Sequence, residues 1–150
     1  LEGSNKGTKA LFFRKKCPDM IIPNFTGPLN ERMEKLNSVL DGHKDIKIVG
    51  SSFGGLMAYI FATLNEPRVD RLILLAPAIN FISSTEYEVR KISTPTWIFH
   101  GQNDNVILLD EVREISNQCF SNLSFTILDD DHLLQKNFMD LEWDQLLGNS

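Results

Sequence analysis

One stretch of the sequence decides the fold: Ile46-Lys47-Ile48-Val49-Gly50-Ser51-Ser52-Phe53-Gly54-Gly55. Its apolar first part predicts a strand, and the apolar residues that follow it predict a helix. Between the two lies Gly-x-Ser-x-Gly, the pattern of a sharp strand-to-helix turn that exposes its serine hydroxyl. Side chains at Gly50 and Gly54 would crowd such a turn, and glycine has no Cβ. Ser52 is therefore the candidate nucleophile, and helix N-terminal amides beside it can face a developing negative charge.

The pentapeptide alone is a weak signal, because glycine and serine are common in loops. Ser51 is a lesser candidate nucleophile, since the glycine spacing selects Ser52. A serine at the start of a helix can also serve only as the N-cap of that helix. The supporting evidence therefore has to come from the rest of the chain.

Two further apolar strands end beside residues that could complete a catalytic site. Residues 96–99 lead into His100-Gly101-Gln102-Asn103-Asp104-Asn105-Val106, and residues 123–128 lead into Asp129-Asp130-Asp131-His132. The carboxyl ends of parallel strands meet at one edge of a sheet, where ligands bind. We therefore expect Ser52, Asp104 and His132 to lie together at that edge.

The sequence resembles the α/β-hydrolase superfamily, in which Ser, Asp and His follow one another in this chain order. The resemblance rests on residues 50–55, residues 100–106 and His132, spans nearly the whole chain, and is greatest to small, lidless bacterial esterase-like members. It implies that Ser52 attacks an acyl carbon. His132 would act first as general base and then as general acid, and Asp104 would orient it.

The resemblance also implies an oxyanion hole formed by the backbone amides of Phe53 and Leu1. Family members have a strand ending in His-Gly before the loop that supplies the first of these amides. We expect that N-terminal strand to be missing from this chain, which opens at Leu1. Between Ala76 and Pro95 the chain is too short for the helical lid of many relatives, so an open pocket that favours small acyl groups is expected.

Three side chains follow the strand at residues 71–76, in the region where a lid would be. Phe81, Ile82 and Tyr87 could form one wall of the acyl pocket. Packing within a surface loop is an equal alternative for these residues.

Other polar residues near the strand ends have structural interpretations. Asp104 could be a turn aspartate, because its neighbours are typical turn residues. Residues 129–131 are rival carboxylate partners for His132, but adjacent residues on one turn rarely present their side chains to each other. We interpret them as a solvated acidic loop. His100 is interpreted as structural, with a place in the site as the alternative, and His43 as solvated.

Strands that alternate with helices predict an α/β fold, with a mostly parallel sheet flanked by helices in a single domain over residues 1–150. Periodicity and turn residues place five strands and five helices. The strands are expected at residues 19–22, 46–49, 71–76, 96–99 and 123–128, and the helices at residues 8–16, 28–40, 53–64, 108–118 and 133–147.

Composition excludes several other classes of function. The 150 residues carry a net charge of −5 without a basic run, which argues against nucleic acid or an anionic membrane as partner. No apolar run is long enough to span a bilayer and no signal-peptide pattern is present, so a cytoplasmic location is expected. Cys17 and Cys119 lie far apart and the three histidines lack metal-site spacing, so we expect no disulfide, metal or cofactor.

Two functional hypotheses follow from the sequence. The preferred one is a serine hydrolase that cleaves small carboxylic esters or thioesters through an acyl-enzyme. The alternative is a non-catalytic α/β-hydrolase-like protein that binds a ligand or a partner. The presence of Ser52, Asp104 and His132 together favours the enzyme, because a binding protein does not need all three.

Overall fold

The structure is a computed structural model that describes residues 6–148. Its centre is a four-stranded parallel sheet in the order β1-β2-β3-β4. The strands are β1 (Ile46–Ser51), β2 (Val69–Leu75), β3 (Thr96–Gly101) and β4 (Leu123–Leu128). All four carboxyl ends therefore point the same way, as the α/β prediction requires, and the chain has an α/β-hydrolase-like fold.

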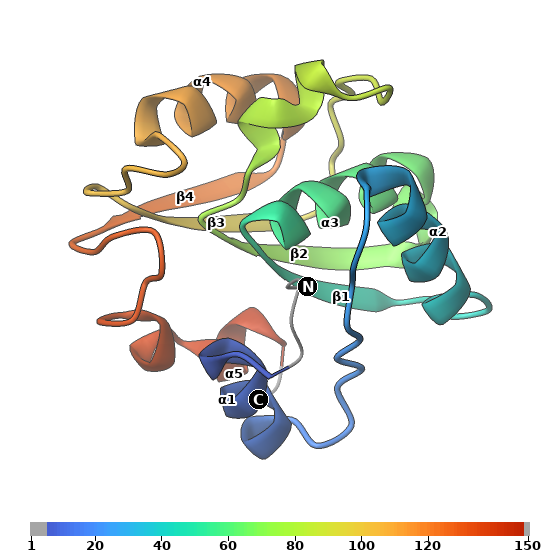
Figure 1. The fold of residues 1–150 in the computed structure, drawn as a ribbon, viewed down its shortest axis with the longest axis horizontal. Coiled ribbons are helices and arrows are strands. Elements are labelled where there is room, and N and C mark those ends of the chain that lie inside the picture. Colours follow the sequence, from blue (N-terminus) through green and yellow to red (C-terminus); the bar gives the residue numbers. More distant parts are fainter. Residues whose placement is uncertain (1–5, 149–150) are drawn as a thin grey trace.

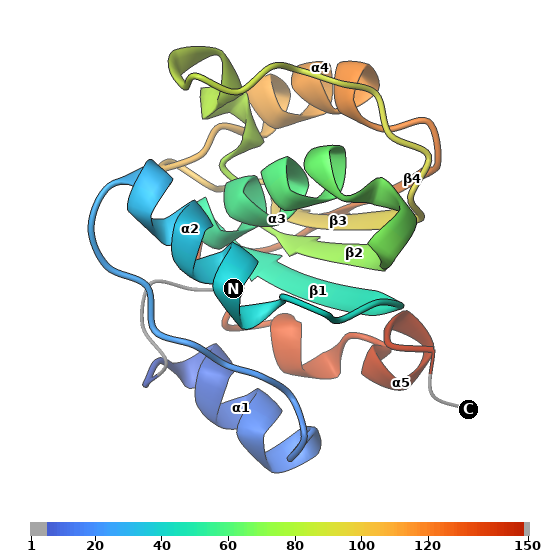
Figure 2. The same ribbon diagram turned by 90° about the vertical axis from the view of Figure 1, so that its right-hand side faces the viewer.

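Helices cover both faces of this sheet (Figures 1 and 2). On one face lie α2 (Leu29–Val39), α3 (Phe53–Leu64) and α4 (Leu109–Cys119). On the other lie α1 (Thr8–Lys16) and α5 (Trp143–Leu146). Three short 3₁₀ helices complete the fold: η1 (Glu66–Arg68), η2 (Ile79–Ser84) and η3 (Phe138–Asp140).

The central strand β2 shows why the sheet is covered twice. Its residues Leu72 and Leu74 belong to the core under α2, α3 and α4, whereas Ile73 and Leu75 belong to the core under α1 and α5. All four side chains are fully buried. A strand that is apolar at consecutive positions is buried on both faces, so the run of leucines and isoleucines in β2 specifies a layer on each side.

The expected strand at residues 19–22 is not present, and the prediction of five strands was wrong for the described chain. Met20–Ile22 and Pro23 lie across a cavity of about 610 Å³ from β1, whose residues line its other wall. An apolar stretch becomes a strand only beside a hydrogen-bonding neighbour, and no strand among residues 6–148 lies next to this one.

The expected helix at residues 133–147 is also wrong, because this segment is broken into turns, η3 and α5. Leu134 has a φ of 55°, outside the helical region. The Nε1–H of Trp143 donates to the carbonyl of Phe138 at 2.7 Å, which ties α5 back to η3. The positive φ of Leu134 and this local side-chain hydrogen bond therefore override a helical pattern that looked continuous in the sequence.

Gly50 is a position in the sheet that has no room for a side chain. A Cβ there would lie 2.6 Å from the carbonyl oxygen of Gly54, in the first turn of α3. We expect Gly50→Ala to lower the free energy of unfolding by about 1–3 kcal/mol, because the backbone of β1 or α3 must shift to relieve the overlap. Urea denaturation measures this change.

The matched control is Asn117→Ala, on the exposed face of α4, where a surface substitution changes stability by less than about 0.5 kcal/mol. Equal stability of the Gly50→Ala variant and the parent chain would contradict the close approach of β1 and α3.

Candidate active site

Ser52 occupies a sharp turn between β1 and α3, with φ 53° and ψ −117°. A non-glycine residue with positive φ is strained, and such strain gathers at functional sites. The turn is held from both sides, since the N–H of Ser52 donates to the carbonyl of Leu75 at 2.9 Å and its carbonyl accepts from the N–H of Ala78 at 2.9 Å. Ser52 stands at the N-cap position, but its hydroxyl makes no capping hydrogen bond. The hydroxyl is therefore left to face another group.

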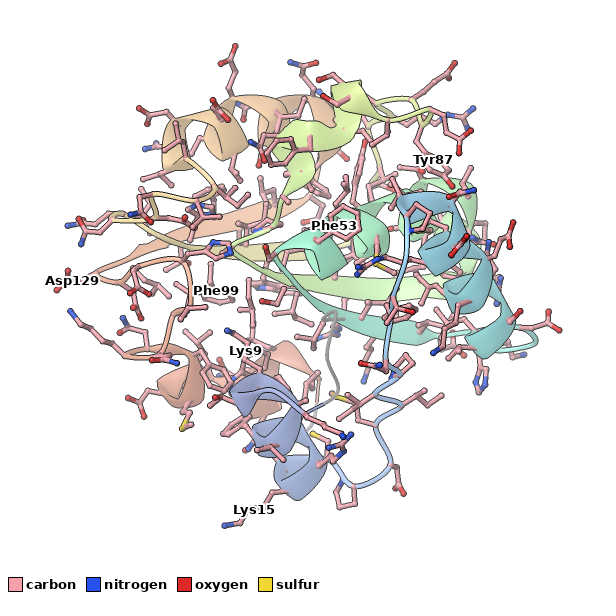
Figure 3. All side chains as sticks on the ribbon, viewed as in Figure 1. Lys9, Lys15, Phe53, Tyr87, Phe99 and Asp129 are labelled. Carbon is pink, nitrogen blue, oxygen red and sulfur yellow. The ribbon has the colours of Figure 1, made fainter. Side chains whose placement is uncertain are left out.

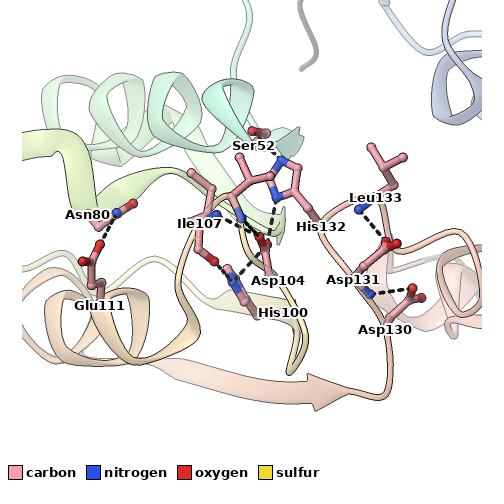
Figure 4. A network of polar contacts seen from close by, with 11 residues as sticks. Ser52, Asn80, His100, Asp104, Ile107, Glu111, Asp130, Asp131, His132 and Leu133 are labelled. Carbon is pink, nitrogen blue, oxygen red and sulfur yellow. Dashed lines mark hydrogen bonds and ion pairs between the residues drawn. The ribbon is translucent and has the colours of Figure 1, made fainter.

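His132 is that group (Figure 4). Its Nε2 lies 3.1 Å from the Oγ of Ser52, and its Nδ1 lies 2.8 Å from Oδ2 of Asp104. A carboxylate only accepts hydrogen bonds, so Nδ1 carries the proton and Nε2 is free to accept the hydroxyl of Ser52. The three residues expected to lie together, which come from the ends of three different strands, are in hydrogen-bond contact.

Asp104 lies in the loop after β3 and is only 5% exposed. Its Oδ1 accepts the backbone N–H groups of Val106 at 2.9 Å and Ile107 at 2.8 Å. These bonds are those of an aspartate in a turn, the alternative weighed from the sequence. Its Oδ2 meanwhile binds His132. One carboxylate thus both holds the turn and binds His132, since its two oxygens have separate partners.

The acidic loop before His132 is not simply solvated, which corrects the interpretation made from the sequence. Asp130 is buried, and its Oδ2 accepts the backbone N–H groups of Lys136 and Asn137, each at 3.1 Å. Its Oδ1 accepts the N–H of Asp131 at 2.9 Å. Asp129 and Asp131 are exposed, as expected. Asp130 therefore organises the loop that carries His132.

Gly101, at the end of β3, is a second residue whose role the sequence did not reveal. A Cβ on Gly101 would lie 2.4 Å from the carbonyl oxygen of Asp130 and 2.5 Å from that of Asp131. Only glycine allows the His132 loop to approach the Asp104 loop this closely. The His-Gly pair at the strand end was the available signal, but its partner 29 positions later could not be read from the sequence.

His100, which precedes this glycine, is fully buried and belongs to the same polar network (Figure 4). Its Nε2 lies 2.7 Å from the carbonyl oxygen of Ile107 and 3.3 Å from Oδ2 of Asp104. Burial lowers the pKa of His100 from its ordinary value of 6.5, against the opposing effect of the Ile107 carbonyl. His100 is therefore neutral at pH 7.

The first turn of α3 presents the backbone amide of Phe53 beside Ser52. The helical N–H bonds to the carbonyl of Ser52 begin with Gly55, at 2.9 Å. The N–H of Phe53 has no backbone acceptor within residues 6–148, as is usual for the first residue of a helix. The other expected oxyanion donor, Leu1, lies outside the described residues.

The three side chains expected to line an acyl pocket are not brought to one surface. Phe81 is 47% exposed, whereas Ile82 is fully buried in the core under α3 and α4. Tyr87 packs against the same core. Figure 3 shows Tyr87 near α2, well away from Asp129 at the end of β4. Of the three side chains, only that of Phe81 is largely exposed.

Residues 6–148 contain neither a candidate metal site nor a candidate membrane span. No group of three or more His, Cys, Asp or Glu side chains there could hold a metal ion. No helix in that part of the chain is long and apolar enough to cross a membrane. Cys119 is buried and Cys17 is half-buried, and both are free thiols.

The parallel sheet with helices on both faces is the fold of the α/β-hydrolase class. Within that class, the model of the dienelactone hydrolase family matches residues 12–126. The chain belongs to this family, and membership of it indicates a hydrolase. A comparison with curated proteins finds no match.

Solved structures agree with this assignment of the fold. Alpha/beta hydrolase domain-containing protein 10 from mouse superposes with a TM-score of 0.79 at 13% identity, covering 97% of this chain and 85% of that one. A putative hydrolase from Agrobacterium vitis S4 gives 0.71 at 20% identity, covering 91% and 80%. An alpha-beta serine hydrolase homologue from Coxiella burnetii gives 0.69 at 17%, covering 98% and 78%. At these identities the likeness shows the fold alone.

The lowered pKa of His100 has a consequence for stability. The unfolded chain takes up a proton at His100 below about pH 6.5, whereas the folded chain does so only at a lower pH. This contribution to stability is therefore complete above pH 6.5 and is lost as the pH falls toward the folded-state pKa, by at most about 1.4 kcal/mol per pH unit.

We expect His100→Gln to remove this part of the pH dependence, because glutamine does not titrate. Urea denaturation at pH 7.5, 6.5 and 5.5 would show a shallower acid slope for the variant. His43→Gln, on the exposed turn before β1, is the control that removes a solvated histidine. An acid slope unchanged by His100→Gln would mean that His100 is protonated equally in both states.

Proposed function

We propose that this protein is a serine hydrolase that cleaves small carboxylic esters or thioesters through an acyl-enzyme. The observation that carries the proposal is the continuous hydrogen-bonded chain from Oγ of Ser52 through His132 to Oδ2 of Asp104. Nucleophile, base and orienting group within hydrogen-bond reach of one another are the signature of nucleophilic catalysis. The family name supports the ester, because a lactone is a cyclic carboxylic ester.

The geometry supports a definite path for the proton. Nε2 of His132 takes the proton of Ser52 as Oγ attacks the acyl carbon, and the resulting imidazolium is stabilised by Asp104. The same Nε2–H then protonates the departing alcohol or thiol. Water, activated by the neutral His132, attacks the acyl-enzyme and restores Ser52.

The developing oxyanion requires donors that are already in place when the carbonyl oxygen becomes charged. The backbone N–H of Phe53, which has no backbone acceptor among residues 6–148, supplies one of them. The ring of Phe53 lies 5.1 Å from the guanidinium carbon of Arg32, a cation–π contact that packs the first turn of α3 against α2. The donor thus sits on a rigid element.

The short connection between β2 and β3 supports a small substrate. This connection holds only η2 and an extended stretch, with no further helix over the strand ends. The exposed ring of Phe81 on η2 offers one apolar contact for an acyl or alcohol group. A site without a covering helix suits a short acyl group better than a long chain.

Labelling with a fluorophosphonate tests whether Ser52 is activated. We expect the parent chain to be labelled on Ser52, as identified by peptide mapping, and Ser52→Ala to take up no label. Ser51→Ala is the matched control, one residue away in the same turn, and should be labelled like the parent chain.

An unlabelled parent chain that still melts cooperatively would contradict the proposal. A protein that binds small esters at this edge of the sheet without turning them over would then be the better explanation, and equilibrium binding of a non-hydrolysable ester analogue would identify it.

Asp104→Asn tests which carboxylate serves His132. An amide at this position can donate to Nδ1 and so favours the wrong tautomer. We expect kcat for a short p-nitrophenyl ester to fall by roughly 10³–10⁴-fold. Asp129→Asn, on the exposed part of the acidic loop, should leave kcat within about twofold of the parent value. Comparable losses in both variants would overturn the assignment of Asp104.

A further inference from the structure

His100 makes two polar contacts with the loop that carries Asp104. Its Nε2 lies 2.7 Å from the carbonyl oxygen of Ile107, which can only accept a hydrogen bond. The proton of the neutral ring therefore sits on Nε2. The same Nε2 lies 3.3 Å from Oδ2 of Asp104, but its hydrogen bond goes to the Ile107 carbonyl.

The peptide group of Ile107 links His100 to Asp104. Its N–H donates to Oδ1 of Asp104 at 2.8 Å, and its carbonyl accepts from Nε2 of His100 at 2.7 Å. His100 lies at the end of β3 and Ile107 lies at the far end of the loop. The histidine thereby ties the loop back to the rigid strand on which the loop begins, with Asp104 held between the two.

The charge state of His100 decides whether its imidazole helps or harms the site. The other ring nitrogen, Nδ1, is buried and has no hydrogen-bond partner among the described residues. A second proton there would be a buried, unpaired charge, and burial accordingly lowers the pKa of His100. A neutral His100 leaves the negative charge of Asp104 available to the imidazolium of His132.

We propose that His100 is a positioning residue: its neutral ring donates through Nε2 to the Ile107 carbonyl, which fixes the peptide whose N–H holds Oδ1 of Asp104, and so aims Asp104 at Nδ1 of His132. The inference rests on the proposed function, because it assigns a task within the same reaction. His100 touches no reacting atom and acts only through Asp104.

Two substitutions separate this task from simple packing. His100→Gln can place an amide N–H near the position of Nε2, whereas His100→Leu fills similar space without a donor. Val112→Ala, at a buried position in α4 outside the network, is the matched control for a general loss of stability. Each full-length variant would be compared with the parent chain well below its melting temperature.

The measured quantity is the second-order rate of labelling of Ser52 by a fluorophosphonate. We expect His100→Leu to lower this rate roughly tenfold, less than the ~100-fold cost of a 1 Å displacement at a reacting group. His100→Gln should stay within about twofold of the parent rate, as should Val112→Ala. A parent-like rate for His100→Leu, or equal losses for the leucine and glutamine variants, would overturn the proposal.

Nitrogen-15 NMR of the histidines gives a readout that needs no reaction. In the parent chain at pH 7 we expect His100 to be the neutral Nε2–H tautomer. The Nδ1–H signal of His132 should move in His100→Leu and hold its position in His100→Gln. A charged ring, or the Nδ1–H tautomer, would overturn the proposal even if His100→Leu failed to fold. An unlabelled parent chain with the expected spectra would refute the proposed hydrolase and leave the role of His100 intact.

Discussion

The parallel pairing of β1, β2, β3 and β4 is the constraint on which the rest of the structure depends. It delivers the chain after each strand to the same edge of the sheet, so that Ser52, Asp104 and His132 can meet although no two of them are close in sequence. Both faces of a parallel sheet must be covered, and here the two hydrophobic cores on either side of β2 cover them.

Asp104 shows how completely a buried charge has to be satisfied. The carboxylate of Asp104 accepts hydrogen bonds from two backbone amides and from His132, and Nε2 of His100 lies 3.3 Å from its Oδ2. An unpaired charge at this depth would be strongly destabilising. The loop amides therefore stabilise the carboxylate, and the carboxylate in turn fixes the conformation of the loop. Structural and functional roles of Asp104 are therefore inseparable.

The sequence predicted the elements whose signals are local. Gly50, Ser52 and the flanking apolar runs define a strand, a turn and a helix within about 20 residues, and β1 and α3 are confirmed there. The failures have two different causes. Residues 19–22 lack a strand to pair with, which is a non-local cause. Residues 133–147 are broken by local side-chain hydrogen bonds, from Lys136 to Asp130 and from Trp143 to Phe138, that a helical pattern does not reveal. The buried role of Asp130 and the need for Gly101 depend on loops that meet only in three dimensions.

The spread of the site along the chain has a consequence for the newly synthesised protein. Ser52 is made first, Asp104 next and His132 last, and a polypeptide leaves the ribosome in that order. Pairing between distant segments is also the slow part of folding a parallel sheet. Until β4 docks on β3, the serine has no base and remains an ordinary hydroxyl. In the proposed hydrolase, Ser52 would therefore become a nucleophile only once the chain has folded, and before that its hydroxyl would be no more reactive than that of any other serine.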